Sequence, residues 1–126
     1  MIADTSFLVA LFIEEDELHN EALNELENNK EELTIPDRVI EETFTVLNYK
    51  KGIDYALGIL QKLDNNKDIN IKSYNEKEWN SIIQLISKVR KKLSFVDYTI
   101  IYECLRTNEK LLCFDKEIIK TIKSFR

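Results

Sequence analysis

Apolar and polar residues follow two different periods along the chain, which separate short strands from longer helices. Four brief apolar segments predict strands, at residues 1–3, 33–35, 68–72 and 110–114. Elsewhere apolar residues recur every three or four positions, a spacing that predicts helices over residues 16–29, 37–51, 53–63, 76–92, 94–106 and 116–125. The apolar run at residues 7–13 follows Asp4, Thr5 and Ser6, which are typical helix-capping residues. This alternation predicts an α/β fold with parallel strands joined by helical crossovers.

Length and composition fit one domain over residues 1–126. With 44% apolar residues the chain is able to bury a core, and only two Gly and one Pro leave little material for tight hairpins. No apolar run reaches the length of a membrane span, and no basic segment precedes the first apolar run as in a signal peptide. We therefore expect a cytoplasmic protein. The two cysteines, Cys104 and Cys113, lie in apolar stretches and are interpreted as small core residues.

The formal net charge of −5 argues against a general nucleic-acid coat protein, which would be basic. The charge is unevenly distributed, however: residues 1–83 carry a net −10 and residues 84–126 a net +5. A polyanion such as RNA could approach the positive part near Arg90, Lys91 and Lys92, which are candidates for phosphate contacts. The simpler interpretation is a solvated helix end whose cations favour the last carbonyl groups.

Four acidic residues stand where the strands lead into helices. Asp4 follows the first strand, Asp115 follows the fourth, Glu42 lies in the helix after the second strand, and Asp97 lies near a helix start. Each acid alone could be a helix cap or a solvated side chain. Together, at one edge of a parallel sheet, they would repel each other unless a divalent cation offset the repulsion. The pattern therefore predicts a metal site suited to phosphodiester hydrolysis.

Other catalytic chemistries lack their residues in this chain. His19 is the only histidine, so catalysis by a pair of histidines is excluded. The sequence contains no glycine-rich phosphate-binding loop, no dinucleotide-binding glycine motif and no serine nucleophile elbow.

Several segments in the same order resemble the PIN domain, and within it the VapC-type toxin ribonucleases of toxin–antitoxin systems. They are Ile2–Phe12, the stretch from Ile35-Pro36 through Glu42 to Leu47, Ser94–Asp97, and Phe114–Lys116. No single segment is specific, but the four occur at suitable distances and span nearly the whole chain. The resemblance implies a three-layer α/β/α fold around a short parallel sheet of four or five strands.

The resemblance also implies function. The positions of the family's acidic site are occupied by Asp4, Glu42, Asp97 and Asp115. Asp4, Asp97 and Asp115 would bind Mg²⁺ or Mn²⁺, and Glu42 would complete the metal's ligand shell or orient the attacking water. The acid usually stands six residues after the proline, which favours Glu42 over Glu41. Thr5 or Ser6 would supply a hydroxyl that supports Asp4. The implied activity is metal-dependent endoribonuclease cleavage of RNA, leaving a 5′-phosphate and a 3′-hydroxyl.

Partners follow from the same resemblance. It implies a homodimer and a cognate antitoxin whose segment enters the acidic groove. Phe44 and Tyr49 are candidate interface residues, although such residues more often belong to the core.

Two departures from the family pattern and two alternatives remain. Cys113 stands where relatives often carry Thr or Ser, which predicts a lost hydrogen bond to a carboxylate, and the chain ends in a basic helical segment where relatives often add a fifth strand.

One alternative is a non-catalytic PIN-like module that binds RNA or protein. The other, a phosphoacceptor receiver domain, would need an acid directly after the third strand, where this chain has Lys72-Ser73.

Overall fold

The computed structural model describes all residues from Met1 to Arg126. Four short strands are present: β1 (Ile2–Ala3), β2 (Leu33–Pro36), β3 (Ile69–Lys72) and β4 (Leu111–Leu112). Seven helices connect and follow them: α1 (Thr5–Phe12), α2 (His19–Asn28), α3 (Asp37–Lys51), α4 (Ile53–Asn65), α5 (Glu76–Val89), α6 (Phe95–Thr107) and α7 (Lys116–Phe125). The predicted elements are all present, with shorter boundaries at several ends.

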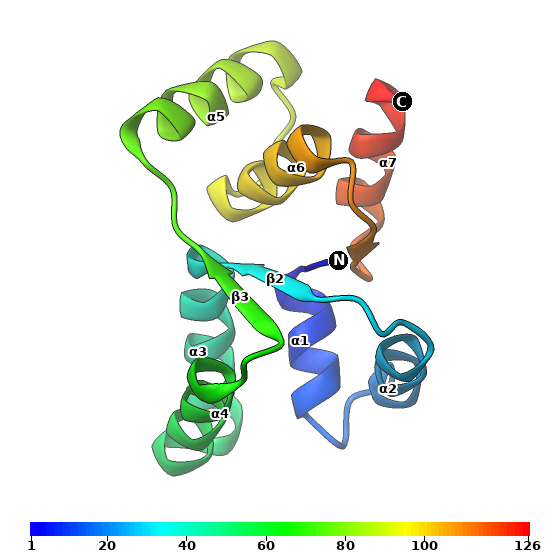
Figure 1. Cartoon of the computed structure of the whole chain (residues 1–126), viewed down its shortest axis with the longest axis vertical. Helices are drawn as coiled ribbons and strands as arrows, with labels where there is room; N and C mark the ends of the chain where they lie inside the picture. Colours follow the sequence, from blue (N-terminus) through cyan, green and yellow to red (C-terminus); the bar gives the residue numbers. More distant parts are fainter.

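The sheet is entirely parallel and has the order β3-β2-β1-β4. Figure 1 shows α1, α3 and α4 on one side of this sheet and α5, α6 and α7 on the other. This is the predicted three-layer α/β/α fold, with four strands and no fifth strand after α7. Because all strands run the same way, the loops that follow them meet at one edge of the sheet.

Local chemistry explains the helix boundaries. Asn75 and Ser94 each cap a helix through a capping box, and α5 and α6 therefore begin directly after them. Arg90 and Asn108 adopt left-handed backbone conformations, both with φ of 55°, and end the same two helices. The predicted helix over residues 76–92 is thus too long, because the backbone turns at Arg90.

The core lies between the two helical layers and the sheet. The sheet and α1 contribute four residues that are at most 1% exposed: Ile2, Ile35, Phe7 and Leu8. The opposite helical layer contributes a further set of fully buried residues: Ile82, Ile100, Ile101, Cys104 and Ile118. Cys104 is a core residue as predicted, and burial raises the pKa of its thiol to about 12. Of the two interface candidates, Phe44 packs against the core, whereas the side chain of Tyr49 is 91% exposed on α3.

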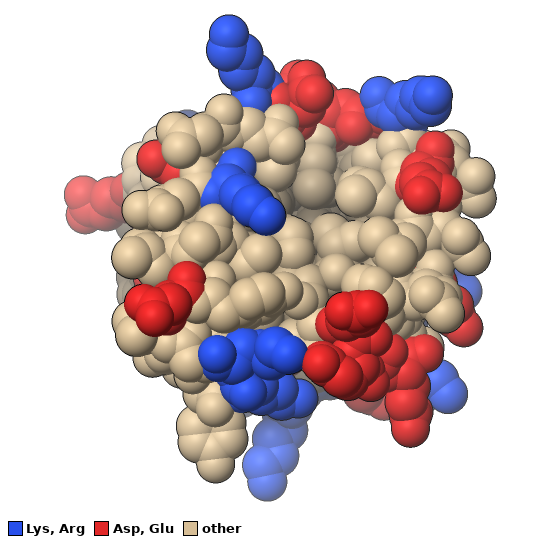
Figure 2. Space-filling model, turned by 90° about the horizontal axis from the view of Figure 1, so that it is seen from below, with Lys and Arg blue, Asp and Glu red and all other residues tan.

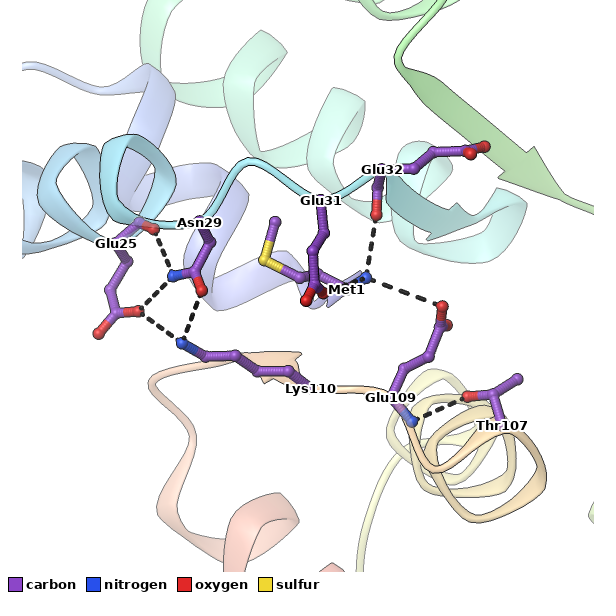
Figure 3. Close-up of polar contacts among 8 residues, drawn as sticks. All are labelled: Met1, Glu25, Asn29, Glu31, Glu32, Thr107, Glu109 and Lys110. Atoms are coloured by element: carbon purple, nitrogen blue, oxygen red, sulfur yellow. Dashed lines mark hydrogen bonds and ion pairs between the residues drawn. The ribbon is translucent and has the colours of Figure 1, made fainter.

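The start of β1 is held on both sides by polar contacts (Figure 3). The α-amino group of Met1 donates to the backbone carbonyl of Glu32 at 2.9 Å and lies 3.8 Å from a carboxylate oxygen of Glu109. Lys110 extends this set by reaching Glu25 and Asn29 on and beside α2. These contacts fix β1 between its two neighbours, and β1 leads directly into the acidic residue Asp4.

The surface carries charges of both signs without a broad basic patch on the face seen from below. Figure 2 shows Lys and Arg side chains next to Asp and Glu side chains around the margin of this face, with an uncharged centre. No helix in the structure combines the length and the apolar character that a membrane span requires.

Candidate functional site

Neighbouring parallel strands bring Asp4 and Asp115 to one edge of the sheet. Asp4 directly follows β1, and Asp115 lies three residues after the end of β4. Because β1 and β4 pair in register through Ile2 with Leu111 and Ala3 with Leu112, their carboxyl ends coincide. The backbone N–H of Asp4 donates to the carbonyl of Leu112 at 3.0 Å and continues this pairing to the site itself.

Asp4 is a buried carboxylate whose two oxygens have different surroundings. Its side chain is the N-cap of α1, and the residue is only 3% exposed. Oδ2 accepts hydrogen bonds from the Ser6 hydroxyl at 2.9 Å and from the Ser6 backbone N–H at 3.4 Å. Oδ1 makes no hydrogen bond, and Asp4 belongs to no ion pair. A buried carboxylate without a cation is costly, so Oδ1 is suited to an incoming positive ligand.

Ser6 is the hydroxyl that supports Asp4, and Thr5 does not share this role. The Ser6 hydroxyl also accepts a hydrogen bond from the backbone N–H of Phe114 at 3.0 Å, so it joins the segment after β1 to the segment after β4. The rings of Phe7 and Phe114 stack beside it with centroids 5.9 Å apart. The Thr5 hydroxyl is buried and has no hydrogen-bond partner.

Cys113 belongs to the acidic site, which corrects its interpretation as a core residue. Its Sγ lies 3.3 Å from Asp4 Oδ2 and accepts a hydrogen bond from the Asp115 backbone N–H at 3.2 Å. Burial and then the negative charge of Asp4 raise the pKa of the thiol, so it stays protonated and donates to Asp4. The predicted loss of a hydrogen bond at this position is therefore wrong, because the thiol makes the contact that a hydroxyl would make.

Asp97 lies within electrostatic reach of the other two aspartates. It is the third residue of α6, and its Oδ2 accepts a hydrogen bond from the Ser94 backbone N–H at 3.1 Å. Burial raises the pKa of Asp97, the hydrogen bonds from Ser94 lower it, and the negative charges of Asp4 and Asp115 raise it further. The net shift is upward. The negative charges of Asp4 and Asp115 thus act on Asp97, although the three residues lie far apart in the sequence.

Glu42, the fourth predicted acid, lies on α3. It is half-buried in the second turn of α3 and makes no side-chain hydrogen bond or ion pair, and its charge is not among the main causes of the Asp97 pKa shift. The neighbouring Glu41 is exposed. The role of Glu42 remains a prediction.

The three aspartates offer the donor chemistry of a hard divalent cation. Asp115 uses Oδ1 to accept hydrogen bonds from the backbone N–H groups of Glu117 and Ile118, at 2.9 and 3.3 Å, as the N-cap of α7. No group of three or more acidic, His or Cys side chains forms a ready cage for an ion. Mg²⁺ is usually bound by one or two carboxylates together with waters, which suits an open pair such as Asp4 and Asp115.

The predicted basic residues lie in the loop that leads into α6. Arg90, Lys91 and Lys92 are exposed and immediately precede the segment that carries Asp97. The Lys91 ammonium donates to the Thr121 hydroxyl at 3.1 Å, and Arg90 Nε donates to the Ser87 carbonyl at 3.0 Å. Lys92 makes no such contact within the protein. Phosphate contacts by these residues remain a prediction.

Sequence reasoning missed Arg38, in the first turn of α3, one turn before Glu42. Its guanidinium carbon lies 5.0 to 5.3 Å from the centroids of three aromatic rings, those of Tyr74, Trp79 and Phe95. These residues come from different elements, so no local sequence signal reveals the cluster.

Comparison with known proteins agrees with this arrangement. The family model of the PIN domain matches residues 1–123. The chain therefore belongs to the PIN domain family.

Two solved structures share the fold. The structure of VapC20 from Mycobacterium tuberculosis, described as a sarcin–ricin loop cleaving toxin, superposes with a TM-score of 0.85 at 20% identity and covers 95% of this chain and 93% of that one. A toxin–antitoxin complex from Klebsiella pneumoniae gives a TM-score of 0.67 at 17% identity, covering 90% of this chain and 85% of that one. No curated protein sequence matches the chain significantly.

Proposed function

We propose that this PIN-domain protein is a metal-dependent endoribonuclease and the toxin of a type II toxin–antitoxin pair. The observation that carries the proposal is the environment of Asp4: a carboxylate at the carboxyl edge of the sheet that is 3% exposed, has no cation partner and lies within electrostatic reach of Asp97. Such an arrangement is suited to a divalent ion that also binds phosphate oxygens. The fold shared with VapC20 supports the proposal.

Each side chain has a distinct task in the proposed reaction. Asp4, Asp97 and Asp115 would hold Mg²⁺ or Mn²⁺, and Ser6 and Cys113 fix the Asp4 carboxylate through Oδ2. When bound, the ion supplies charge stabilisation for the phosphoryl group and acidifies a water molecule. Glu42 orients the attacking water from α3. Hydrolysis of the phosphodiester then leaves a 5′-phosphate and a 3′-hydroxyl.

Cleavage of a defined RNA by the purified protein tests this proposal. We expect cleavage with Mg²⁺ or Mn²⁺, none with EDTA, and 5′-phosphate ends by mass spectrometry. Asp4→Asn should lower the rate at least 100-fold, since removal of a metal ligand removes transition-state stabilisation. RNA binding without cleavage by the wild-type protein would instead support the non-catalytic PIN-like module.

The second part of the proposal concerns protein partners. We infer a cognate antitoxin that covers the acidic site, and a homodimer of the toxin. Co-expression with the product of an adjacent reading frame, followed by light scattering on a sizing column, tests both. A complex whose formation suppresses RNA cleavage is expected; a protein that stays monomeric and binds no such product would refute this part without affecting the nuclease assay.

A further inference from the structure

We propose that Trp79 and Arg38 form a platform that binds single-stranded RNA beside the acidic site, with a nucleobase stacked on Trp79 and a phosphate neutralised by Arg38. The inference rests on the proposed ribonuclease function and assigns part of its substrate contact. It concerns residues that lie outside the acidic motif positions.

The platform is a stack of rings around one cation. The rings of Trp79 and Phe95 stack with centroids 4.6 Å apart and an interplanar angle of 28°. The Arg38 guanidinium lies 5.3 Å from both centroids and 5.0 Å from that of Tyr74. Lys72 adds a second cation, 5.1 Å from the Tyr74 ring. Aromatic rings combined with cations are the usual elements of single-strand binding.

Arg38 is a cation without an anionic partner. It forms no ion pair and no hydrogen bond in the protein, and its Nη1 is buried without an acceptor. By contrast, the neighbouring Lys72 is neutralised by Glu78 at 3.0 Å. Buried donors are normally satisfied, and a guanidinium is the side chain best suited to a phosphate. Nη1 is covered, whereas Nη2 and Nε also make no hydrogen bond but are not covered in the same way, so these two nitrogens can donate to an anionic ligand.

Trp79 is exposed where a packing residue would be covered. It lies in the first turn of α5, on the same side of the sheet as α6 (Figure 1), and is 43% exposed although one partner ring already stacks on it. A ring used only to attach α5 to α6 would gain more stability from full burial. The exposed surface of Trp79 is free to accept a base.

The platform shares its edge of the sheet with the acids. Arg38 follows β2 and Tyr74 follows β3, and the order β3-β2-β1-β4 places them on one side of Asp4, with Asp115 on the other. Strand spacing puts the ends of β2 and β3 about 5 and 10 Å from that of β1. Stacked RNA covers this span in about two or three nucleotides. A strand cleaved at Asp4 would thus reach the platform, and the exposed ring of Trp79 beside the guanidinium of Arg38 favours RNA as its occupant.

Trp79 is the only tryptophan of the chain, so its fluorescence reports on the platform directly. The full-length Asp4→Asn protein, which should bind RNA without cutting it, is titrated with a single-stranded RNA of about ten nucleotides. Quenching of Trp79 fluorescence and the anisotropy of a labelled copy of the same RNA are measured in parallel. We expect both signals to saturate with the same Kd.

Variants of the platform complete the test. In the same background, Trp79→Leu should weaken RNA binding about 5- to 100-fold, because stacking on one aromatic ring contributes that much. Trp79→Phe should restore most of it. Arg38→Gln should lower the slope of log Kd against log salt by about 0.7, the contribution of one phosphate contact. Lys62→Gln, at an exposed residue on α4, is a control variant that should change neither quantity.

The outcomes separate this inference from the proposed function. RNA that binds without quenching Trp79, or with an affinity that is unchanged in correctly folded Trp79→Leu protein, would overturn the platform alone. Quenching by an antitoxin but not by RNA would overturn it as well. Failure of the wild-type protein to cleave any RNA would refute the proposed function instead.

Discussion

Removal of the Ser6 hydroxyl should destabilise the protein and impair the acidic site together. Ser6→Ala deletes a donor to the Asp4 carboxylate at 2.9 Å and an acceptor for the Phe114 N–H at 3.0 Å. A hydrogen bond to a charged group contributes about 1.5–3 kcal/mol and one between neutral groups about 0.5–1.5 kcal/mol. Alanine offsets about 0.5 kcal/mol through its better helix propensity in α1. We therefore expect a net loss of about 1.5–4 kcal/mol.

Equilibrium denaturation in urea measures this loss, and Ser81→Ala is the matched control. Ser81 lies in helix α5, and its hydroxyl donates only to the Lys77 carbonyl one turn earlier. The control variant should change the free energy of unfolding by less than about 0.5 kcal/mol. Ser6→Ala should also weaken Mn²⁺ binding about 10- to 100-fold, because the carboxylate loses its orienting contact. Equal stability of the two variants would refute the described role of Ser6.

Three further predictions concern buried or interacting groups. Burial and the charges of Asp4 and Asp115 raise the pKa of Asp97 above its unfolded value. Above the raised pKa, the ionised Asp97 carboxylate therefore lowers the free energy of unfolding. Below pH 3.8, where the carboxyl group is protonated in both the folded and the unfolded state, this penalty is absent. Asp97→Asn should accordingly stabilise the protein in EDTA at neutral pH but abolish stabilisation by Mn²⁺, as thermal unfolding would show. Arg106→Met should cost about 2–4 kcal/mol, because it leaves the carboxylate of Glu103, which is 1% exposed, without its cation. Cys113→Ser should keep kcat/KM within a few fold, whereas Cys113→Ala should lower it about tenfold or more through the lost contact to Asp4.

Each of these three predictions has its own control or its own contradicting result. Lys110→Met removes an exposed ion pair with Glu25 and should cost less than about 1 kcal/mol, so an Arg106 variant no less stable than this control contradicts the buried-pair argument. Lower stability of Asp97→Asn in EDTA would show that capping by Asp97 outweighs its repulsion. Equal activity of the Ser and Ala variants at Cys113 would assign that thiol no positioning role.

The fold could be predicted from the sequence because its signals are local. Apolar periodicity indicates the helices, and capping residues such as Ser94 and Asn75 mark where two of them begin. Boundaries were less accurate where tertiary structure decides them. The strand predicted at residues 110–114 is reduced to Leu111–Leu112, since the chain leaves the sheet to place Cys113 against Asp4.

The site could be predicted only in part, for the same physical reason. The positions of Asp4 and Asp115 follow from strand order, because parallel strands end at one edge. The contact between Cys113 and Asp4 joins residues 109 positions apart, and nothing in the local pattern indicates it. Arg38 was missed because the aromatic rings around it come from the β3–α5 loop, α5 and α6.

Anomalous diffraction from crystals of the protein soaked in Mn²⁺ tests most directly whether the acidic site binds a divalent cation. We expect an anomalous peak within coordination distance of a carboxylate oxygen of Asp4, shared with Asp115 or Asp97 directly or through water, and lost in Asp4→Asn crystals. Strong Mn²⁺ peaks elsewhere and none beside Asp4, in crystals whose site is open to solvent, would contradict it.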